Sequence, residues 1–144
     1  MDKYYSHTQF GAVMIAIATA AFIFGLWSIS TQGGVASLII LIIAILLAFL
    51  FSTMNVSVGP GEIHVTLGAG IIRKRFDMNE VKSAQPVKNP WYYGWGIRWF
   101  PGGWLYNVSG FNAVEIEMRS GKKYRIGTDE PEELLSAIKA NIQN

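Results

Sequence analysis

The chain has 144 residues, of which 51% are hydrophobic and 15% charged, and its mean hydropathy is +0.27. This balance is too apolar for an ordinary soluble domain and makes membrane segments the first feature to look for. The absence of cysteine excludes a disulfide framework and a thiolate metal site. The net charge of +2 is modest, so the placement of the charges is more informative than their sum.

Two uncharged apolar runs occupy the first third of the chain, residues 11–29 and residues 35–51. A helix over residues 11–29 spans about 28 Å, close to the roughly 30 Å of a bilayer's hydrocarbon core. The short "STQGG" between the runs requires two antiparallel neighbours. We therefore predict a transmembrane hairpin over residues 1–53, with helices at about 10–29 and 35–53.

Two other interpretations of these runs are a cleaved signal peptide and a buried pair of core helices. The small residues at 18–20 fit a cleavage site, but the chain stays apolar after them, whereas a signal peptide turns polar. A buried pair needs a large soluble shell around it. The remaining residues, 54–144, have the pattern of a self-contained β domain and are poor candidates for that shell.

The basic residues predict the orientation of the hairpin. Eleven of the twelve lysines and arginines follow residue 72, the other is Lys3, and the connecting turn has none. Because positive charge is retained in the cytoplasm, we expect both termini to be cytoplasmic and the turn to face outward.

Residues 54–144 begin with an alternation of apolar and polar residues on both sides of "GPGE", at residues 59–62. This pattern predicts a hairpin in which Val58 faces Ile63. Further strands are predicted over "IIRKRF" and over "VKSAQPV", the latter ending near Pro86.

A second hairpin is predicted over residues 114–118 and 123–126. A three-residue loop, Ser120 to Lys122, keeps the apolar residues on one face and pairs Met118 with Tyr124 and Glu117 with Arg125. A helix follows at about 130–142, with Thr128 or Asp129 as its N-cap. Its apolar stripe consists of Leu134, Leu135, Ile138 and Ile142.

The segments "YGWGIR", "GWLYNVSG" and "AVEIEMRSGKKYRIGTDEPEELLSAI", with the apolar hairpin before them, resemble small bacterial membrane proteins that carry a pleckstrin-homology-like domain. The resemblance covers nearly the whole chain. It implies an α+β membrane protein of the bacterial inner membrane, in which about seven antiparallel strands form two packed, roughly orthogonal sheets closed by a C-terminal helix. It implies little about function, because a fold does not determine function.

The sequence contains no recognisable group of catalytic or metal-binding residues. His7 and His64 each lack a second ligand at metal-binding spacing, and Glu115 and Glu117 are explained by basic residues on the next strand. "GWGIRW" lacks the third glycine of a dinucleotide site, and there is no P-loop. We expect no enzymatic activity, no cofactor and no bound metal.

The densest basic cluster is Arg73, Lys74 and Arg75. It is either a solvated strand edge or a contact for anionic lipid headgroups. The "GPGE" turn contains an acid and no base, so the phosphoinositide site known in some pleckstrin-homology domains is not carried over. Nucleic acid is not an expected partner, because eleven basic residues nearly balance nine acidic ones after residue 54.

Residues 89–107, "NPWYYGWGIRWFPGGWLYN", hold four of the five tryptophans. These rings could fill the core, contact the bilayer or bind a protein. Strand parity predicts that Tyr93, Trp95, Ile97 and Trp99 share one face, and that Gly94, Gly96 and Arg98 share the other. The candidate membrane or partner contacts are Trp91, Trp95, Arg98, Trp99, Phe100 and Trp104.

Together these features predict a non-catalytic, membrane-tethered binding or assembly module that self-associates or binds a membrane partner through residues 89–107. The alternatives are an accessory subunit of a transporter or enzyme complex and a module that binds lipid headgroups.

Overall fold

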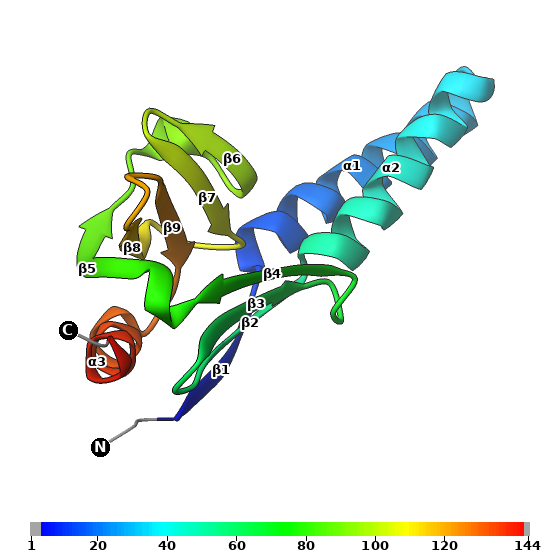
Figure 1. The fold of residues 1–144 in the computed structure, drawn as a ribbon. Helices are drawn as coiled ribbons and strands as arrows, with labels where there is room; N and C mark the ends of the chain where they lie inside the picture. The colour runs from blue at the N-terminus through cyan, green and yellow to red at the C-terminus, as the bar shows by residue number, and fades with distance from the viewer. Residues whose placement is uncertain (1–3, 143–144) are drawn as a thin grey trace.

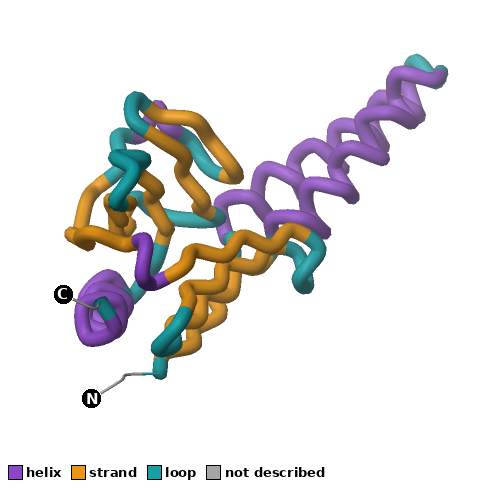
Figure 2. Tube along the Cα trace, in the orientation of Figure 1, coloured by secondary structure: helices purple, strands orange, loops and turns teal. Residues whose placement is uncertain are grey.

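The computed structural model describes residues 4–142, which form two N-terminal helices, nine strands in two sheets, and a C-terminal helix. Figure 1 shows the two N-terminal helices side by side, projecting away from the strands. Figure 2 shows the same helix pair in purple and the strands of the β domain in orange. In chain order the elements are β1 (Tyr5–Phe10), α1 (Ala12–Thr31), α2 (Val35–Phe51), β2 (Thr53–Val58), β3 (Glu62–Leu67), β4 (Ile72–Asp77), the 3-10 turn η1 (Met78–Glu80), β5 (Val81–Lys88), the 3-10 turn η2 (Trp91–Tyr93), β6 (Gly96–Phe100), β7 (Gly103–Asn107), β8 (Asn112–Met118), β9 (Lys123–Gly127) and α3 (Pro131–Asn141).

The helices α1 and α2 pack through small residues. Ala18, Ser28, Ser37 and Ala44 are buried between them, and the hydroxyls of Ser28 and Ser37 lie 2.6 Å apart in a hydrogen bond. Gly25 allows the second helix to approach closely, because a Cβ there would meet Leu41. Most of the large apolar side chains of both helices are exposed. Within residues 4–142, α1 is the one helix long and apolar enough to cross a membrane, whereas the apolar α2 has 17 residues.

The helix pair joins the strands almost without a linker. Only Ser52 separates the end of α2 from β2, and the amide of Gly11 donates a 2.7 Å hydrogen bond to the Ser52 carbonyl. The start of α1 and the end of α2 are therefore fastened together where they meet the β domain.

The strands form a four-stranded sheet in the order β1-β2-β3-β4 and a five-stranded sheet in the order β5-β8-β9-β7-β6. The prediction of about seven antiparallel strands is wrong in two respects within the described residues. The strand β1 precedes the first apolar helix, and β7 pairs with β9 in parallel. The sequence does not predict β1 because most of its residues are polar. It does not predict the β7–β9 pairing because these segments are not neighbours in the chain.

The hairpin registers test the parity arguments directly. Val58 lies opposite Ile63, as predicted. In the second hairpin the loop has three residues, but it comprises residues 119–121 rather than 120–122, since the Met118 amide bonds the Lys122 carbonyl. The predicted pairing of Glu117 with Arg125 is therefore wrong by two residues, and Arg125 faces Glu115 instead. The predicted faces of this hairpin are nevertheless correct, because a shift of two residues keeps every side chain on its face.

The two sheets and α3 enclose one core, to which both sheets contribute fully buried side chains. Leu134 and Ile138 of α3 are fully buried, whereas Leu135 and Ile142 are partly buried. The N-cap of α3 is Glu130 rather than Thr128 or Asp129, because Pro131 begins the helix. Thr128 still supports this end, as its hydroxyl accepts the Glu130 amide at 2.9 Å.

Candidate interaction surface

Residues 89–107 fold into η2 and the β6–β7 hairpin, which forms one edge of the five-stranded sheet. Trp99 of β6 and Trp104 of β7 are directly opposite one another. Their exposed fractions are 66% and 46%, which is unusual for the largest apolar side chain. We call Trp99 and Trp104 the tryptophan pair.

The tryptophan pair lies on the inward face of the five-stranded sheet, beyond the region that the other sheet covers. By strand parity it shares this face with Ile97, which is partly buried, and Tyr106, which is buried. An open hollow of about 310 Å³ lies beside the pair and is lined also by Lys122, Lys123, Tyr124, Gly102 and Gly103. The core face of the sheet thus continues into an exposed aromatic surface.

The prediction of Phe100 as a membrane or partner contact is wrong, because its side chain is buried, with only 2% exposed. Its ring stacks on Tyr93 with centroids 5.9 Å apart, and the guanidinium of Arg125 lies 4.6 Å from the ring centre. The predicted alternation from Tyr93 to Trp99 fails because η2 and the positive φ of Gly94 interrupt the strand. Tyr93 therefore covers the face opposite the tryptophan pair.

The other predicted contact residues of this segment differ in exposure. Trp91 is exposed on η2, next to Tyr92, which is also exposed. Trp95 is partly buried, and its indole nitrogen donates to the Gly110 carbonyl at 3.0 Å. Arg98 is exposed and folds back, since its Nε donates to the Trp95 carbonyl at 2.9 Å.

The basic cluster on β4 does not form one patch, because its residues alternate between faces. Arg73 and Arg75 are exposed on the outer face of the four-stranded sheet. The Lys74 ammonium lies over the rings of Phe76 and Tyr124, at 5.5 and 5.3 Å from their centres. Arg73, Lys74 and Arg75 are neighbours in the sequence, but the strand places Lys74 on the opposite face from the two arginines.

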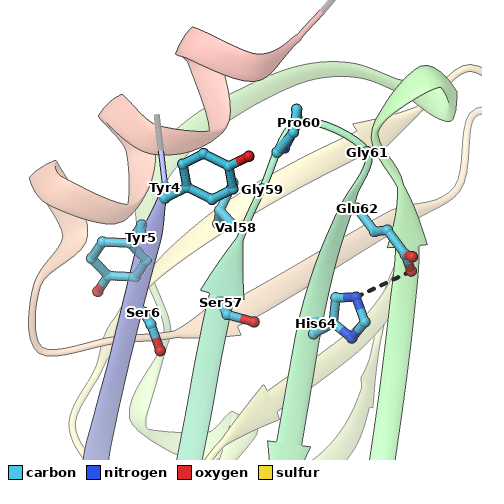
Figure 3. A pocket seen from close by; sticks show the side chains of 10 residues that line it. All are labelled: Tyr4, Tyr5, Ser6, Ser57, Val58, Gly59, Pro60, Gly61, Glu62 and His64. Carbon is cyan, nitrogen blue, oxygen red and sulfur yellow. Dashed lines mark ion pairs between the residues drawn. The ribbon is translucent and has the colours of Figure 1, made fainter. Parts of the chain in front are cut away.

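An open hollow of about 660 Å³ lies around the "GPGE" turn and is lined partly by the N-terminal residues Tyr4, Tyr5 and Ser6 (Figure 3). Glu62 and His64 form an ion pair at 3.2 Å there, and Ser57 is the cross-strand neighbour of His64. A serine nucleophile activated by a histidine is marked by a hydrogen bond between the two side chains, and none joins Ser57 to His64 among the described residues. The sequence pattern does not indicate this hollow, because part of its lining comes from the unpredicted strand β1.

His7 has acidic partners that sequence spacing did not indicate. Its Nε2 lies 2.8 Å from Asp129 and its Nδ1 lies 3.5 Å from Glu130, while the neighbouring Tyr5 donates to Glu130 at 3.0 Å. The buried Gln9 donates to the Gly127 carbonyl at 2.6 Å. These contacts fasten β1 to the segment that leads into α3. Within residues 4–142 no cluster of three histidine or acidic residues could hold a metal ion.

No protein-family model, characterised protein or solved structure matches this chain. The described architecture is that of an α+β protein with an apolar N-terminal helix pair, two packed sheets and a C-terminal helix.

Proposed function

We propose that this protein is a non-catalytic assembly module, tethered to the bacterial inner membrane by α1 and α2, that self-associates through its tryptophan pair. The β domain is proposed to be pleckstrin-homology-like, since two packed sheets closed by a C-terminal helix agree with that resemblance.

The packing of the helix pair supports a membrane anchor. Helices in lipid associate through small residues that let their backbones approach closely. They present their large apolar side chains to the surrounding lipid. The buried alanines and serines between α1 and α2, with outward side chains such as Ile23 and Ile42, follow this arrangement. The helices extend about 30 and 26 Å, enough for both to span a thin or locally thinned bilayer. Both termini are then cytoplasmic, as the lysines and arginines indicate.

The observation that carries the assembly function is the exposure of Trp99 and Trp104 as neighbours on an edge hairpin. Tryptophans are strongly enriched at the centres of protein interfaces, where they fill pockets on the partner. The hollow beside the pair offers such a pocket to the ring of a second copy. Because the pair and the hollow are on the same surface, a symmetric dimer would use each of them twice.

Light scattering on the full chain in mild detergent tests this function. We expect a defined oligomer for the natural chain and a monomer after Trp99→Ser with Trp104→Ser. The matched control, Trp91→Ser with Tyr92→Ser, removes two exposed rings outside the pair and should retain the oligomer. A strictly monomeric natural chain without a co-purifying protein would contradict the proposal.

A further inference from the structure

Three segments of the β domain meet the ends of the two N-terminal helices. The turn between β3 and β4 contacts α2 at Gly68, where a Cβ would lie 2.8 Å from the backbone of Leu50. The turn after β7 contacts the start of α1, where Gly11 abuts Val108. The start of β6 lies beside the ring of Phe51.

Two of these meeting points carry exposed apolar side chains. Phe10, directly before Gly11, is 72% exposed, and Ile71 in the β3–β4 turn is 57% exposed. Phe111, in the turn after β7, is also exposed and packs on Trp95 with ring centres 5.8 Å apart. These side chains lie around the helix ends rather than in the tryptophan pair.

Two arginines belong to the same segments. The Arg73 Nε donates to the Gly70 carbonyl at 2.6 Å, as Arg98 does to Trp95, so both guanidinium groups are held to the loops near the helix ends. Neither arginine forms an ion pair among the described residues. The segments 8–11, 68–73, 94–98 and 108–112 contain no acidic residue. We call Phe10, Ile71, Phe111, Arg73 and Arg98 the collar.

We propose that the collar binds the headgroup region of an anionic bilayer, with its apolar side chains in the interface and its two arginines on lipid phosphates. This inference rests on the proposed function only in requiring that the helices span the membrane, and it does not require self-association.

The place and the charge of the collar favour lipid over a protein partner. A domain joined to spanning helices by one residue must meet the headgroups at the helix ends, where aromatic and basic residues are favoured. The inference also divides the basic cluster of β4. Arg73 contacts lipid, whereas Lys74 covers aromatic rings and Arg75 lies opposite His64, farther along the strand.

Spin labels on the full chain test the collar, and the absence of native cysteine makes each introduced label unique. We place labels at Ser109→Cys beside the collar, at Ser120→Cys in the turn after the far end of β8, and at Ala20→Cys within α1. The seven residues of β8 span about 23 Å. The protein is reconstituted in nanodiscs of phosphatidylcholine, with or without phosphatidylglycerol. Accessibility to an aqueous nickel chelate and to lipid-soluble oxygen is measured for each label.

We expect the Ser109 label to be shielded from nickel relative to the Ser120 label, and the shielding to increase with phosphatidylglycerol. Arg73→Gln with Arg98→Gln should abolish that increase. The control Arg75→Gln with Lys139→Gln removes the same charge elsewhere and should retain it.

A Ser109 label that is as accessible to nickel as the Ser120 label, or an increase that persists without the two arginines, would overturn the collar. The Ala20 label separates this failure from a failure of the anchor. If the Ala20 label is shielded from nickel while the Ser109 label is accessible to it, the membrane span of α1 is supported and lipid binding by the collar is refuted. If Ala20 is also open to nickel, the anchor itself is refuted.

Discussion

Arg125 donates a 2.8 Å hydrogen bond from its Nε to the carboxylate of Glu115, directly opposite on the neighbouring strand. The Glu115 side chain is only 6% exposed, and Gln85 donates to its other oxygen. Arg125 also bonds the side-chain oxygen of Asn89 and lies over the Phe100 ring. One buried ion pair thus links the centre of the sheet to the aromatic segment.

We expect Arg125→Leu to lower the free energy of unfolding by about 3 kcal/mol, because the buried carboxylate of Glu115 would lose its close partner and keep only the more distant Lys123 ammonium, at 3.8 Å, as an ion partner. Replacing both residues by leucine should recover most of the loss. Chemical unfolding in detergent, followed by near-ultraviolet circular dichroism, measures both effects.

The control for this prediction is Glu117→Gln. Glu117 is paired with Lys82, whose hydrogen bond lowers the pKa of Glu117 below its usual range, but the pair is exposed. Exposed pairs contribute little, so this variant should unfold much like the natural chain. Equal losses for Arg125→Leu and Glu117→Gln would refute the distinction.

The parallel pairing of β7 with β9 depends on Gly103. A Cβ at this position would overlap the backbone carbonyl oxygen of Lys123, and no side-chain rotation could relieve that clash. We expect Gly103→Ala to lower the free energy of unfolding by more than about 4 kcal/mol or to prevent folding. The control is Gly61→Ala, where a Cβ meets nothing within 4 Å, and an unfolding midpoint for Gly103→Ala equal to that control would argue against the pairing.

Stability should fall at alkaline pH because of Tyr5. Burial, and then the hydrogen bond to Glu130, raises the pKa of Tyr5 well above its ordinary value near 10, and burial raises the pKa of Tyr106 too. Above pH 10 the unfolded chain loses these protons while the folded protein retains them, so stability decreases as pH rises.

The variant Tyr5→Phe should therefore lose stability less steeply than the natural chain above pH 10, with a remaining slope from Tyr106. Thermal midpoints measured at a series of alkaline pH values give the two slopes. Parallel curves would show that β1 does not hold Tyr5 in the described position.

The parts of the fold that local pattern determines were predictable. The hairpin that pairs Val58 with Ile63 follows from period-two alternation on both sides of a turn, and the α3 stripe follows from helical spacing. Parity fixed the faces of the second hairpin, but only the burial of Glu115 selects the register. A sequence pattern of charges cannot show which glutamate is inside.

The site was less predictable because tertiary contacts decide it. Phe100 and Trp99 are adjacent aromatic residues, yet one is core and the other is exposed, according to where η2 folds over the sheet. The collar depends on turns far apart in the chain that converge on the helix ends. Neither feature has a signal in local periodicity.

Two copies of the chain are proposed to meet in the membrane through the surface around the tryptophan pair. Lys122→Cys places a single thiol beside the hollow, and Lys139→Cys places one on α3 as the control. A short bis-maleimide cross-linker is applied to native membranes that contain either full-length variant. We expect a covalent dimer for Lys122→Cys and a monomer for Lys139→Cys, whereas a monomer for both variants, or equal amounts of dimer for both, would refute self-association through this surface.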